Sequence, residues 1–422
     1  MNNYKTITMR QTSILLLLAG LLSFSCSSEP GVSLQVTNPL NQKRSDAAIL
    51  ISRGEIVNWT TIPANQLPVL KDVHNEFIPC QVNDVDGDGS WDELFALTDM
   101  EAGAQQWITV EFIAPEDYPE FPVRTNLHLG DAKNNYKKLD RARRLDGVSY
   151  HNYADNTSAS FQMEGPAWEN DLVGYRNYMD QRNGMDIFGK TTSAMVLDNV
   201  GKADEPSYHE PGDWGMDVLK VGTSLGAGAI GYMYKDSIYR VGDNGSGTYE
   251  VVFRGSQRSR FKLDYTNWKV EDQVVEVSHQ IGIAAGRRFY QGMVTYSGTE
   301  EDMNLVVGIV NMLSEQLHVL ELDEQYTGLY TMDHQAEDGS LLTMALVVPT
   351  SYLIRTDETR NEGEGVIQTY YALLDASPGD ALNYRFYSLW EKEDKRWSSV
   401  EEIEKYLKTE AQRWTQSVVY AN

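Results

Sequence analysis

The stretch EGPAWENDLVGYRNYMDQRNG (residues 164–184) decides the fold class, because it fits both a helix and a strand. Four apolar side chains follow the spacing of one helical face: Trp168, Leu172, Tyr175 and Met179. Asn183-Gly184, however, is a strong β-hairpin turn sequence, and Gly174 weakens a helix by about 1 kcal/mol relative to alanine. We therefore predict strands that turn at Asn183-Gly184.

A strand sorts the side chains of this stretch by alternation. One side would carry Leu172, Gly174, Arg176, Tyr178, Asp180 and Arg182, and the other would carry Val173, Tyr175, Asn177 and Met179. The second side suits a core. The first is polar and aromatic, and it suits either a ligand-binding face or the solvated face of an ordinary sheet.

Alternation also dominates the rest of the chain. Short β-branched or aromatic runs predict strands at 32–38, 47–53, 107–113, 249–255, 259–265, 274–283 and 304–310. A Gly-rich turn predicts a hairpin over 239–253. A capping box at Ser399 and Glu402 begins a C-terminal helix over 399–418, and a weaker helix or a polar loop is expected over 131–144. The pattern predicts an all-β fold, a large antiparallel β-sandwich with a peripheral C-terminal helix.

The amino terminus has the features of an export signal. Lys5 and Arg10 precede an apolar stretch, Ser13 to Phe24, which is too short to span a membrane. We predict a signal peptide over 1–25 and a lipidated Cys26, as in a bacterial lipobox. An ordinary signal with an incidental Cys26 is the alternative. Cys80 then has no disulfide partner, and residues 26–422 are expected to form a single large domain.

The formal charge of −25 argues against nucleic acid as a partner. An anionic ligand would need a local cationic pocket, for which Arg254 is one candidate. The acidic loop DVDGDGSWDE (residues 84–93) places oxygen ligands as a calcium loop does, at Asp84, Asp86, Asp88 and Asp92. Phe95 replaces the usual glutamate at the twelfth position, so an acidic turn without metal stays open as the alternative.

A second loop, YHEPGDWGMD (residues 208–217), resembles a functional site. His209 can transfer a proton near neutral pH, and Glu210 or Asp213 could orient it. Trp214 offers a flat surface for a sugar ring, and His151 lies in a similar cluster of residues. The sequence contains no zinc, serine-hydrolase, P-loop or dinucleotide motif, so we expect no nucleotide or redox cofactor.

Two segments, 164–190 and 208–228, carry a resemblance to lipoproteins from Gram-negative polysaccharide degraders that were long classified as a domain of unknown function. The resemblance implies a β-supersandwich like that of galactose mutarotases and a lipid anchor in the outer membrane. It also implies an anionic oligosaccharide substrate, shared with other enzymes of one degradation pathway. One member of this family is associated with dehydration of unsaturated uronyl oligosaccharides from ulvan.

That chemistry assigns expected roles to the candidate residues. A base and an acid are needed, from His209 or His151 with Tyr178 or Glu164 as partner. Cations and flat rings would hold the sugar: Arg176, Arg182, Arg254, Trp168 and Trp214, beside Asp213. Two other functions compete: a glycoside hydrolase using a carboxylate pair from Glu164, Asp180 and Asp213, and a non-catalytic surface glycan-binding lipoprotein.

Overall fold

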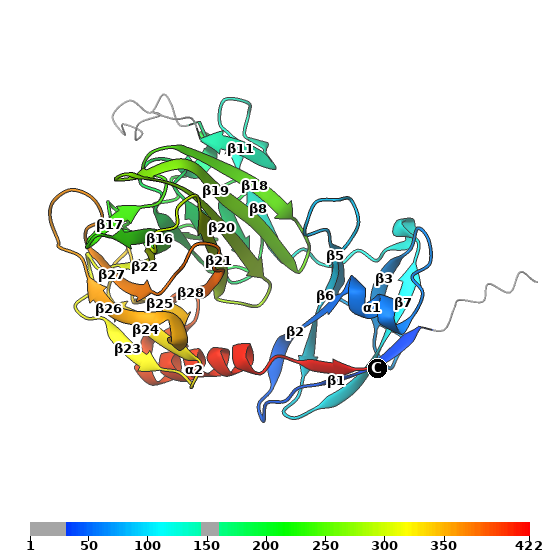
Figure 1. Ribbon diagram of the computed structural model, residues 1–422. Coiled ribbons are helices and arrows are strands. Elements are labelled where there is room, and N and C mark those ends of the chain that lie inside the picture. Colours follow the sequence, from blue (N-terminus) through cyan, green and yellow to red (C-terminus); the bar gives the residue numbers. More distant parts are fainter. Residues whose placement is uncertain (1–30, 145–159) are drawn as a thin grey trace, which may run out of the picture.

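The computed structural model describes residues 31–144 and 160–422, and in these ranges strands dominate (Figure 1). All the sheets are antiparallel, and α2 (Val400–Thr415) is the longer of the two α-helices described. The predicted all-β class with a C-terminal helix is confirmed. Within the described ranges, no helix has the length and apolar character needed to cross a membrane.

The first seven strands and the last strand of the chain form two facing sheets around a core of their own, which we call the N-terminal module. The remaining strands form the part that we call the body. The five-stranded sheet has the order β29-β1-β7-β3-β4, with β29 (Val419–Ala421), β1 (Val32–Thr37), β7 (Gln105–Ile113), β3 (Leu67–Lys71) and β4 (Phe77–Ile78). The three-stranded sheet contains β2 (Arg44–Ser52), β6 (Glu93–Met100) and β5 (Cys80–Asn83), and α1 (Arg53–Trp59) follows β2. A short 3-10 helix, η1 (Pro115–Asp117), follows β7.

The body contains a nine-stranded sheet packed against two five-stranded sheets around the largest core. In sheet order, the nine strands are β11 (Arg141–Arg144), β18 (Ser246–Phe253), β19 (Arg258–Val270), β20 (Gln273–Ala284), β21 (Phe289–Ser297), β28 (Leu382–Trp390), β25 (Leu342–Pro349), β24 (Tyr326–Asp333) and β23 (His318–Glu321). One five-stranded sheet contains β17 (Ser237–Arg240), β16 (Ala227–Tyr234), β22 (Asn304–Val310), β27 (Thr369–Leu374) and β26 (Leu353–Glu358).

The other five-stranded sheet carries the stretch on which the fold class depended. Its order is β15 (Gly215–Asp217), β14 (Met185–Lys190), β13 (Val173–Asn177), β12 (Ala167–Asn170) and β8 (Thr125–His128). The strand prediction for 164–184 is confirmed, with two strands instead of one because the chain turns at Asp171-Leu172. A second hairpin joins β13 to β14 near the predicted turn, where Asn183 has a φ of 38°.

Two local predictions are wrong. The segment 239–253 does not form a hairpin, because β17 pairs with β16 whereas β18 pairs with β11 and β19 in another sheet. Of the two alternatives for 131–144, the helix is wrong: a polar turn at 132–136 and the short strands β9 (Gly130–Asp131), β10 (Lys137–Lys138) and β11 occupy the segment. The remaining short 3-10 helices are η2 (Gln162–Glu164), η3 (Thr350–Tyr352) and η4 (Lys395–Ser398).

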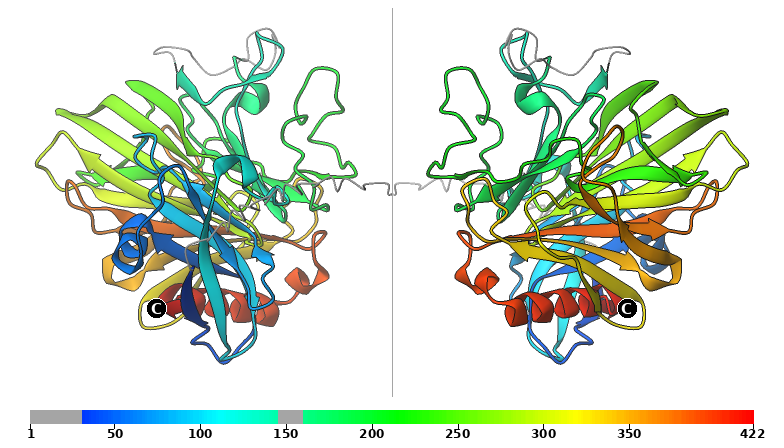
Figure 2. Two further views of the ribbon diagram at one scale, coloured as in Figure 1. Left: turned by 90° about the vertical axis from the view of Figure 1, so that its right-hand side faces the viewer. Right: turned by 90° about the vertical axis from the view of Figure 1, so that its left-hand side faces the viewer.

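Helix α2 joins the two parts of the molecule. At the start of α2, the Ser399 side chain accepts a hydrogen bond from the main-chain N–H of Glu402, as the sequence of this helix start predicts. Ile403, Leu407 and Ala411 pack on the nine-stranded sheet, and the chain then returns to the N-terminal module as β29 (Figure 1). Seen from the side, loop 191–214 stands out from the body (Figure 2). The expectation that residues 26–422 form a single domain stays a prediction.

Candidate functional site

The sheet β15-β14-β13-β12-β8 has two faces of opposite character. The pairing register places one set of alternate residues on the body core: Leu127, Trp168, Tyr175, Ile187 and Met216. The other set is mostly polar and contains the half-buried Asn126 and six buried residues, His128, Glu169, Arg176, Asp186, Lys190 and Asp217. Buried charges are costly unless they are paired. This charged face is therefore the candidate functional site.

Arg176 is the centre of one half of the charged face. Its side chain is 1% exposed, and it donates to Asp186 at 2.7 Å, to Asp217 at 2.8 Å and to the Tyr178 hydroxyl at 2.8 Å. Its Nη1 also donates to the Tyr208 hydroxyl at 3.0 Å. With its nitrogens engaged inside the protein, Arg176 cannot clamp a substrate carboxylate as predicted. It instead fixes the positions of its neighbours.

Tyr178 is also placed differently from its predicted role. Its hydroxyl is buried and donates to Asp186 at 2.5 Å, and burial raises its pKa well above the usual value. A phenol so placed does not reach a substrate, so the prediction of Tyr178 as a catalytic group is corrected. Tyr178 acts through Asp186 as a positioning residue.

His209 lies at the open end of this cluster. Its side chain is 49% exposed, its Nδ1 lies 3.5 Å from Asp217 Oδ2, and its ring lies against Tyr208 with centroids 4.3 Å apart. Burial of part of the ring, and then the positive charge of Arg176, lower the pKa of His209 below its ordinary value. His209 is therefore neutral near pH 7 and able to accept a proton.

Asp217, which the sequence reasoning missed, takes the place expected for Glu210 or Asp213. Both of those residues are exposed, whereas Asp217 is buried. Burial, followed by the charge of Asp186, raises the pKa of Asp217 well above its usual value. Asp217 closes the motif YHEPGDWGMD, and its place at the end of the alternating run Gly215–Asp217 could have marked it.

Arg176, Tyr178, Asp180 and Arg182 lie close together, but not on one strand as predicted, because β13 ends at Asn177 and the last three residues follow it in the turn. Arg182 lies 2.6 Å from Asp180 and 3.3 Å from Glu164, and its guanidinium lies 3.9 Å from the centre of the Tyr178 ring. What the group binds stays a prediction.

Glu164 lies in a strained segment, because it and the preceding Met163 both have positive φ, 65° and 54°. Strain of this kind persists where surrounding contacts hold it, often at functional sites. Gly165 is required next to it, since a Cβ there would clash with the Asn177 carbonyl oxygen.

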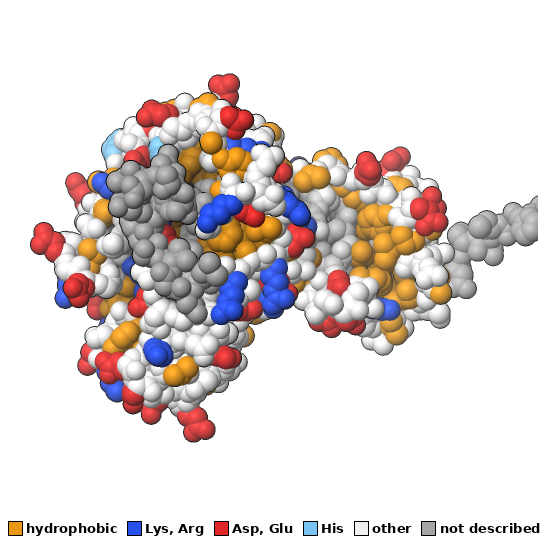
Figure 3. Space-filling view, turned by 90° about the horizontal axis from the view of Figure 1, so that it is seen from above, with side chains coloured by type: hydrophobic (Ala, Val, Ile, Leu, Met, Phe, Trp, Pro, Cys, Tyr) orange, Lys and Arg blue, Asp and Glu red, His pale blue; other side chains and the backbone are white. Residues whose placement is uncertain are grey.

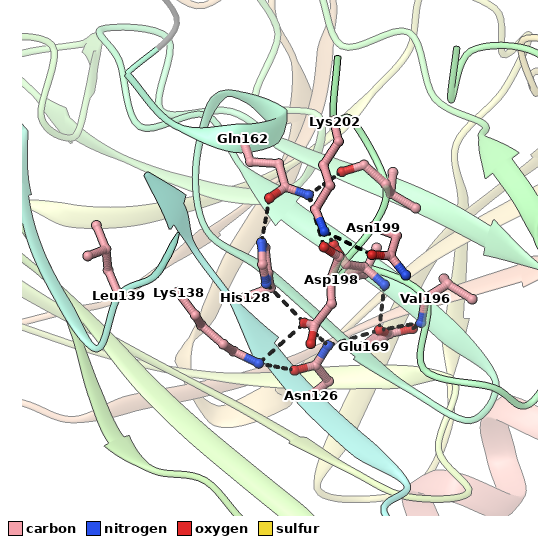
Figure 4. Close-up of polar contacts among 12 residues, drawn as sticks. Asn126, His128, Lys138, Leu139, Gln162, Glu169, Val196, Asp198, Asn199 and Lys202 are labelled. Atoms are coloured by element: carbon pink, nitrogen blue, oxygen red, sulfur yellow. Dashed lines mark hydrogen bonds and ion pairs between the residues drawn. The ribbon is translucent and has the colours of Figure 1, made fainter. Parts of the chain in front are cut away.

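A second cluster, which the sequence reasoning also missed, occupies the β8 end of the charged face (Figure 4). His128 is buried between Asp198, 3.0 Å from Nδ1, and Gln162, 2.8 Å from Nε2. Lys138 lies 2.7 Å from the side-chain oxygen of Asn126 and 3.3 Å from Asp198. The Asp198 and Lys138 side chains stay 56% and 34% exposed, so this end also reaches solvent.

The two clusters are linked by shared elements. Gln162 in η2 contacts His128, and the next residue, Met163, accepts a hydrogen bond from Arg176 through its carbonyl. Between the clusters, Lys190 and Glu169 form an ion pair of 2.6 Å in which both side chains are fully buried. Four strand spacings, about 19 Å, separate β8 from β15, so the two ends that reach solvent are joined by a buried stretch of the face.

The predicted sugar-stacking residues have different positions. Trp168 is fully buried on the core face, stacked 5.8 Å from Tyr175, so its predicted role in sugar stacking is wrong. Trp214 is half-buried against Phe188, with ring centroids 6.0 Å apart, and Asp213 is exposed beside it.

Arg254 does not join the Arg176 cluster. It pairs with Asp140, near the second cluster, where burial and then the charge of Arg254 lower the pKa of Lys138. On the face seen from above, Lys and Arg side chains gather around a hollow (Figure 3).

The remaining predicted sites lie elsewhere. The acidic loop joins β5 to β6 and brings carboxylate oxygens of Asp84, Asp86 and Asp88 within 4.8 Å of one another. The Asp92 carboxylate instead accepts from the main-chain N–H of Val85 at 2.6 Å, which orders the loop. Calcium binding stays a prediction. His151, Cys26 and the signal peptide lie outside the described residues.

Comparisons with known proteins give no activity directly. The chain has 6% identity and a TM-score of 0.40 to an alpha-mannosidase from Enterococcus faecalis V583, over 92% of this chain and 45% of that chain. It has 6% identity and a TM-score of 0.39 to a glycosyl hydrolase family 38 protein from Enterococcus faecalis, over 93% of this chain and 47% of that one. The chain thus spans about half the length of these structures.

A protein assigned as an aldose 1-epimerase, from Klebsiella pneumoniae, has 8% identity and a TM-score of 0.33, over 67% of this chain and 96% of that chain. No functionally curated protein matches the chain. Residues 36–419 match the family described as "Domain of unknown function (DUF4861)", and the chain therefore belongs to that family.

Proposed function

We propose that this protein is a carbohydrate-active dehydratase that eliminates water from unsaturated uronyl oligosaccharides, with His209 as the proton-accepting group. One observation carries the assignment of the site: a neutral, half-exposed imidazole lies 3.5 Å from a buried Asp217 at the open end of a row of buried charges. The substrate class rests on the resemblance of segments 164–190 and 208–228 to lipoproteins of polysaccharide degraders.

The elimination needs one base and one acid. His209 accepts the proton as the carbon–hydrogen bond breaks, and a carbon–carbon double bond forms. Tyr208 donates its hydroxyl proton to the departing hydroxyl, which leaves as water as the carbon–oxygen bond breaks. Transfer of the proton from His209 back to Tyr208 restores both groups. Nothing is oxidised or reduced overall.

Tyr208 is proposed as the acid in place of Tyr178. Burial raises the pKa of Tyr208, so that the phenol is protonated near pH 7. Its oxygen accepts from Arg176 Nη1 at 3.0 Å, a contact that leaves its own proton to be donated and stabilises the phenolate that forms. Arg176 therefore serves the reaction without touching the substrate.

Binding of an anionic sugar is proposed to use the exposed cations at the β8 end. Lys138 and Arg254 reach solvent there. Export with a lipid anchor at Cys26 in the outer membrane, and structural calcium in the acidic loop, complete the proposal.

The test is incubation with lyase-generated unsaturated oligosaccharides, followed by mass spectrometry. Loss of one water from an intact oligosaccharide supports dehydration. Addition of water across a glycosidic bond would mean a glycoside hydrolase, and affinity without any product would mean a glycan-binding protein.

The residue assignment is tested with His209→Ala, against His74→Ala as the matched control, an exposed histidine in the N-terminal module. We expect His209→Ala to lower kcat/KM by roughly 10²–10⁴-fold. Both variants should keep the free energy of unfolding within about 0.5 kcal/mol of the parent. Near-normal turnover by His209→Ala would contradict the assignment of His209 as the proton-accepting group.

A further inference from the structure

A cavity of about 330 Å³ lies at the junction of the N-terminal module and the body, away from the charged face. Its walls come from three places: β2, the turn between β20 and β21, and α2 with the preceding η4. Five cationic side chains line it: Arg287, Arg288, Arg396, Lys405 and Arg413. Ligand sites are common at such junctions.

Most of these cations have carboxylate partners close by. Arg288 lies 2.6 Å from Glu393, Arg396 lies 2.6 Å from Asp394, and Arg413 lies 2.6 Å from Glu410. Lys405 is only loosely paired, 3.7 Å from Glu402, and its side chain is 72% exposed.

The wall residue Arg287 and its neighbour Arg44 form no ion pair within 4.0 Å in the described part of the chain. Arg287 donates to the main-chain carbonyl of Asp46, and Arg44 donates to that of Gln416. Arg44 precedes the wall residue Ser45 and is 5% exposed, and its Nε has no hydrogen-bond partner among the described residues. A buried guanidinium nitrogen without an acceptor is costly.

These guanidinium groups are also close enough to repel one another. Burial, and then the charges of Arg413 and Arg287, lower the pKa of Arg44 to about 10. A local excess of positive charge is unexpected in a chain with a formal charge of −25, where carboxylates are abundant. An anion in the cavity would offset this repulsion and supply acceptors that the protein does not.

We propose that this junction cavity is a second binding site, for an oxyanion group such as sulfate or phosphate, either free or carried on a larger ligand. The guanidinium fork suits such oxygens, which can accept two parallel hydrogen bonds. Because the wall residue Ser45 belongs to the N-terminal module while Arg287 and Arg413 belong to the body and α2, an anion in the cavity lies between the two parts. The site is independent of His209 and of the proposed dehydration.

The probes are sodium sulfate and sodium phosphate against sodium chloride at equal ionic strength, with thermal unfolding and calorimetric titration as readouts. Sulfate or phosphate should bind saturably and raise the unfolding midpoint by at least about 2 °C. Glucose 6-sulfate, with glucose as its control, distinguishes the two sources. Binding of the ester shows that the site accepts a carried group, and binding of the inorganic ions alone shows a site for the free anion.

Two charge reversals on the same helix locate the site. Lys405→Glu changes the cavity wall, and Lys408→Glu makes the same change at an exposed position of α2 outside the wall. Lys405→Glu should weaken oxyanion binding at least tenfold, whereas Lys408→Glu and His209→Ala should bind like the parent. The proposal is overturned if neither the ions nor the ester binds, or if Lys405→Glu and Lys408→Glu weaken binding equally.

Discussion

The two faces of the sheet β15-β14-β13-β12-β8 are one residue apart along each strand, yet they are stabilised in different ways. On the core face, Ile187 packs among other apolar side chains. On the charged face, the neighbouring Asp186 accepts from Arg176 and Tyr178. Apolar contacts have no preferred direction, and a core tolerates changes that keep its volume. A buried ion pair is different, because loss of one partner leaves the other charged and desolvated.

The difference has a consequence for function. A face made of paired buried charges holds its groups in fixed positions, and at its ends those groups meet solvent through His209 and through Lys138 with Asp198. On the core face, apolar packing holds the sheet against the rest of the body. We therefore expect changes on the charged face to affect both stability and activity, and changes on the core face to affect stability alone.

The largest effect is expected for Lys190→Met. Lys190 Nζ donates to Glu169 at 2.6 Å and to the carbonyls of Asn170 and Ala194 at 2.6 and 2.7 Å. Its removal leaves a fully buried carboxylate without its cation, which costs about 3–5 kcal/mol in the free energy of unfolding. Urea unfolding measures the loss.

The double variant Lys190→Met with Glu169→Gln is the control for that measurement. It removes both charges, so it should recover part of the lost stability. If the single and double variants are equally destabilised, the cost comes from lost packing or main-chain hydrogen bonds, and the two faces differ less than their contacts indicate.

A second effect concerns the pH dependence of the proposed reaction. Burial lowers the pKa of His209 below 6.5 and raises that of Asp217, so both groups favour their neutral forms. The base form of His209 is present above its lowered pKa and is lost as the pH falls through it. We expect kcat/KM to be flat at pH 7 and to fall about tenfold per pH unit on an acid limb with its midpoint below 6.5. A midpoint above 6.5 would show that the imidazolium is stabilised instead.

Local patterns in the sequence were enough for the class of the fold. Alternation identifies strands such as β1, β7 and β20, and the Asn183-Gly184 turn with Gly174 separates strand from helix in the stretch 164–184. Pairing between strands is not local. The segment 239–253 contains a turn between two strands, but these strands belong to different sheets, so the expected hairpin is absent.

The candidate site was predictable only where its groups lie close together in the sequence. Arg176, Tyr178 and Arg182 share one stretch, and their grouping was foreseen. His128 and Asp198 are 70 positions apart, and only the sheet register and loop 191–214 bring them to 3.0 Å. The burial of a side chain could not be predicted from its residue type. Trp168 and Trp214 have the same side chain, but only Trp214 is partly exposed.

The smallest effect is expected for Ile187→Val, one residue from Asp186 on β14. Ile187 is fully buried on the core face, so loss of one methyl group should cost about 0.5–1.5 kcal/mol in the free energy of unfolding. The folded variant should keep the parent kcat/KM, because no contact of Arg176 or His209 changes. Urea unfolding and steady-state kinetics on the same preparation measure both quantities. A tenfold loss of kcat/KM at this small cost in stability would show that the core face also sets the geometry of the charged face, and the separation of roles between the two faces would not hold.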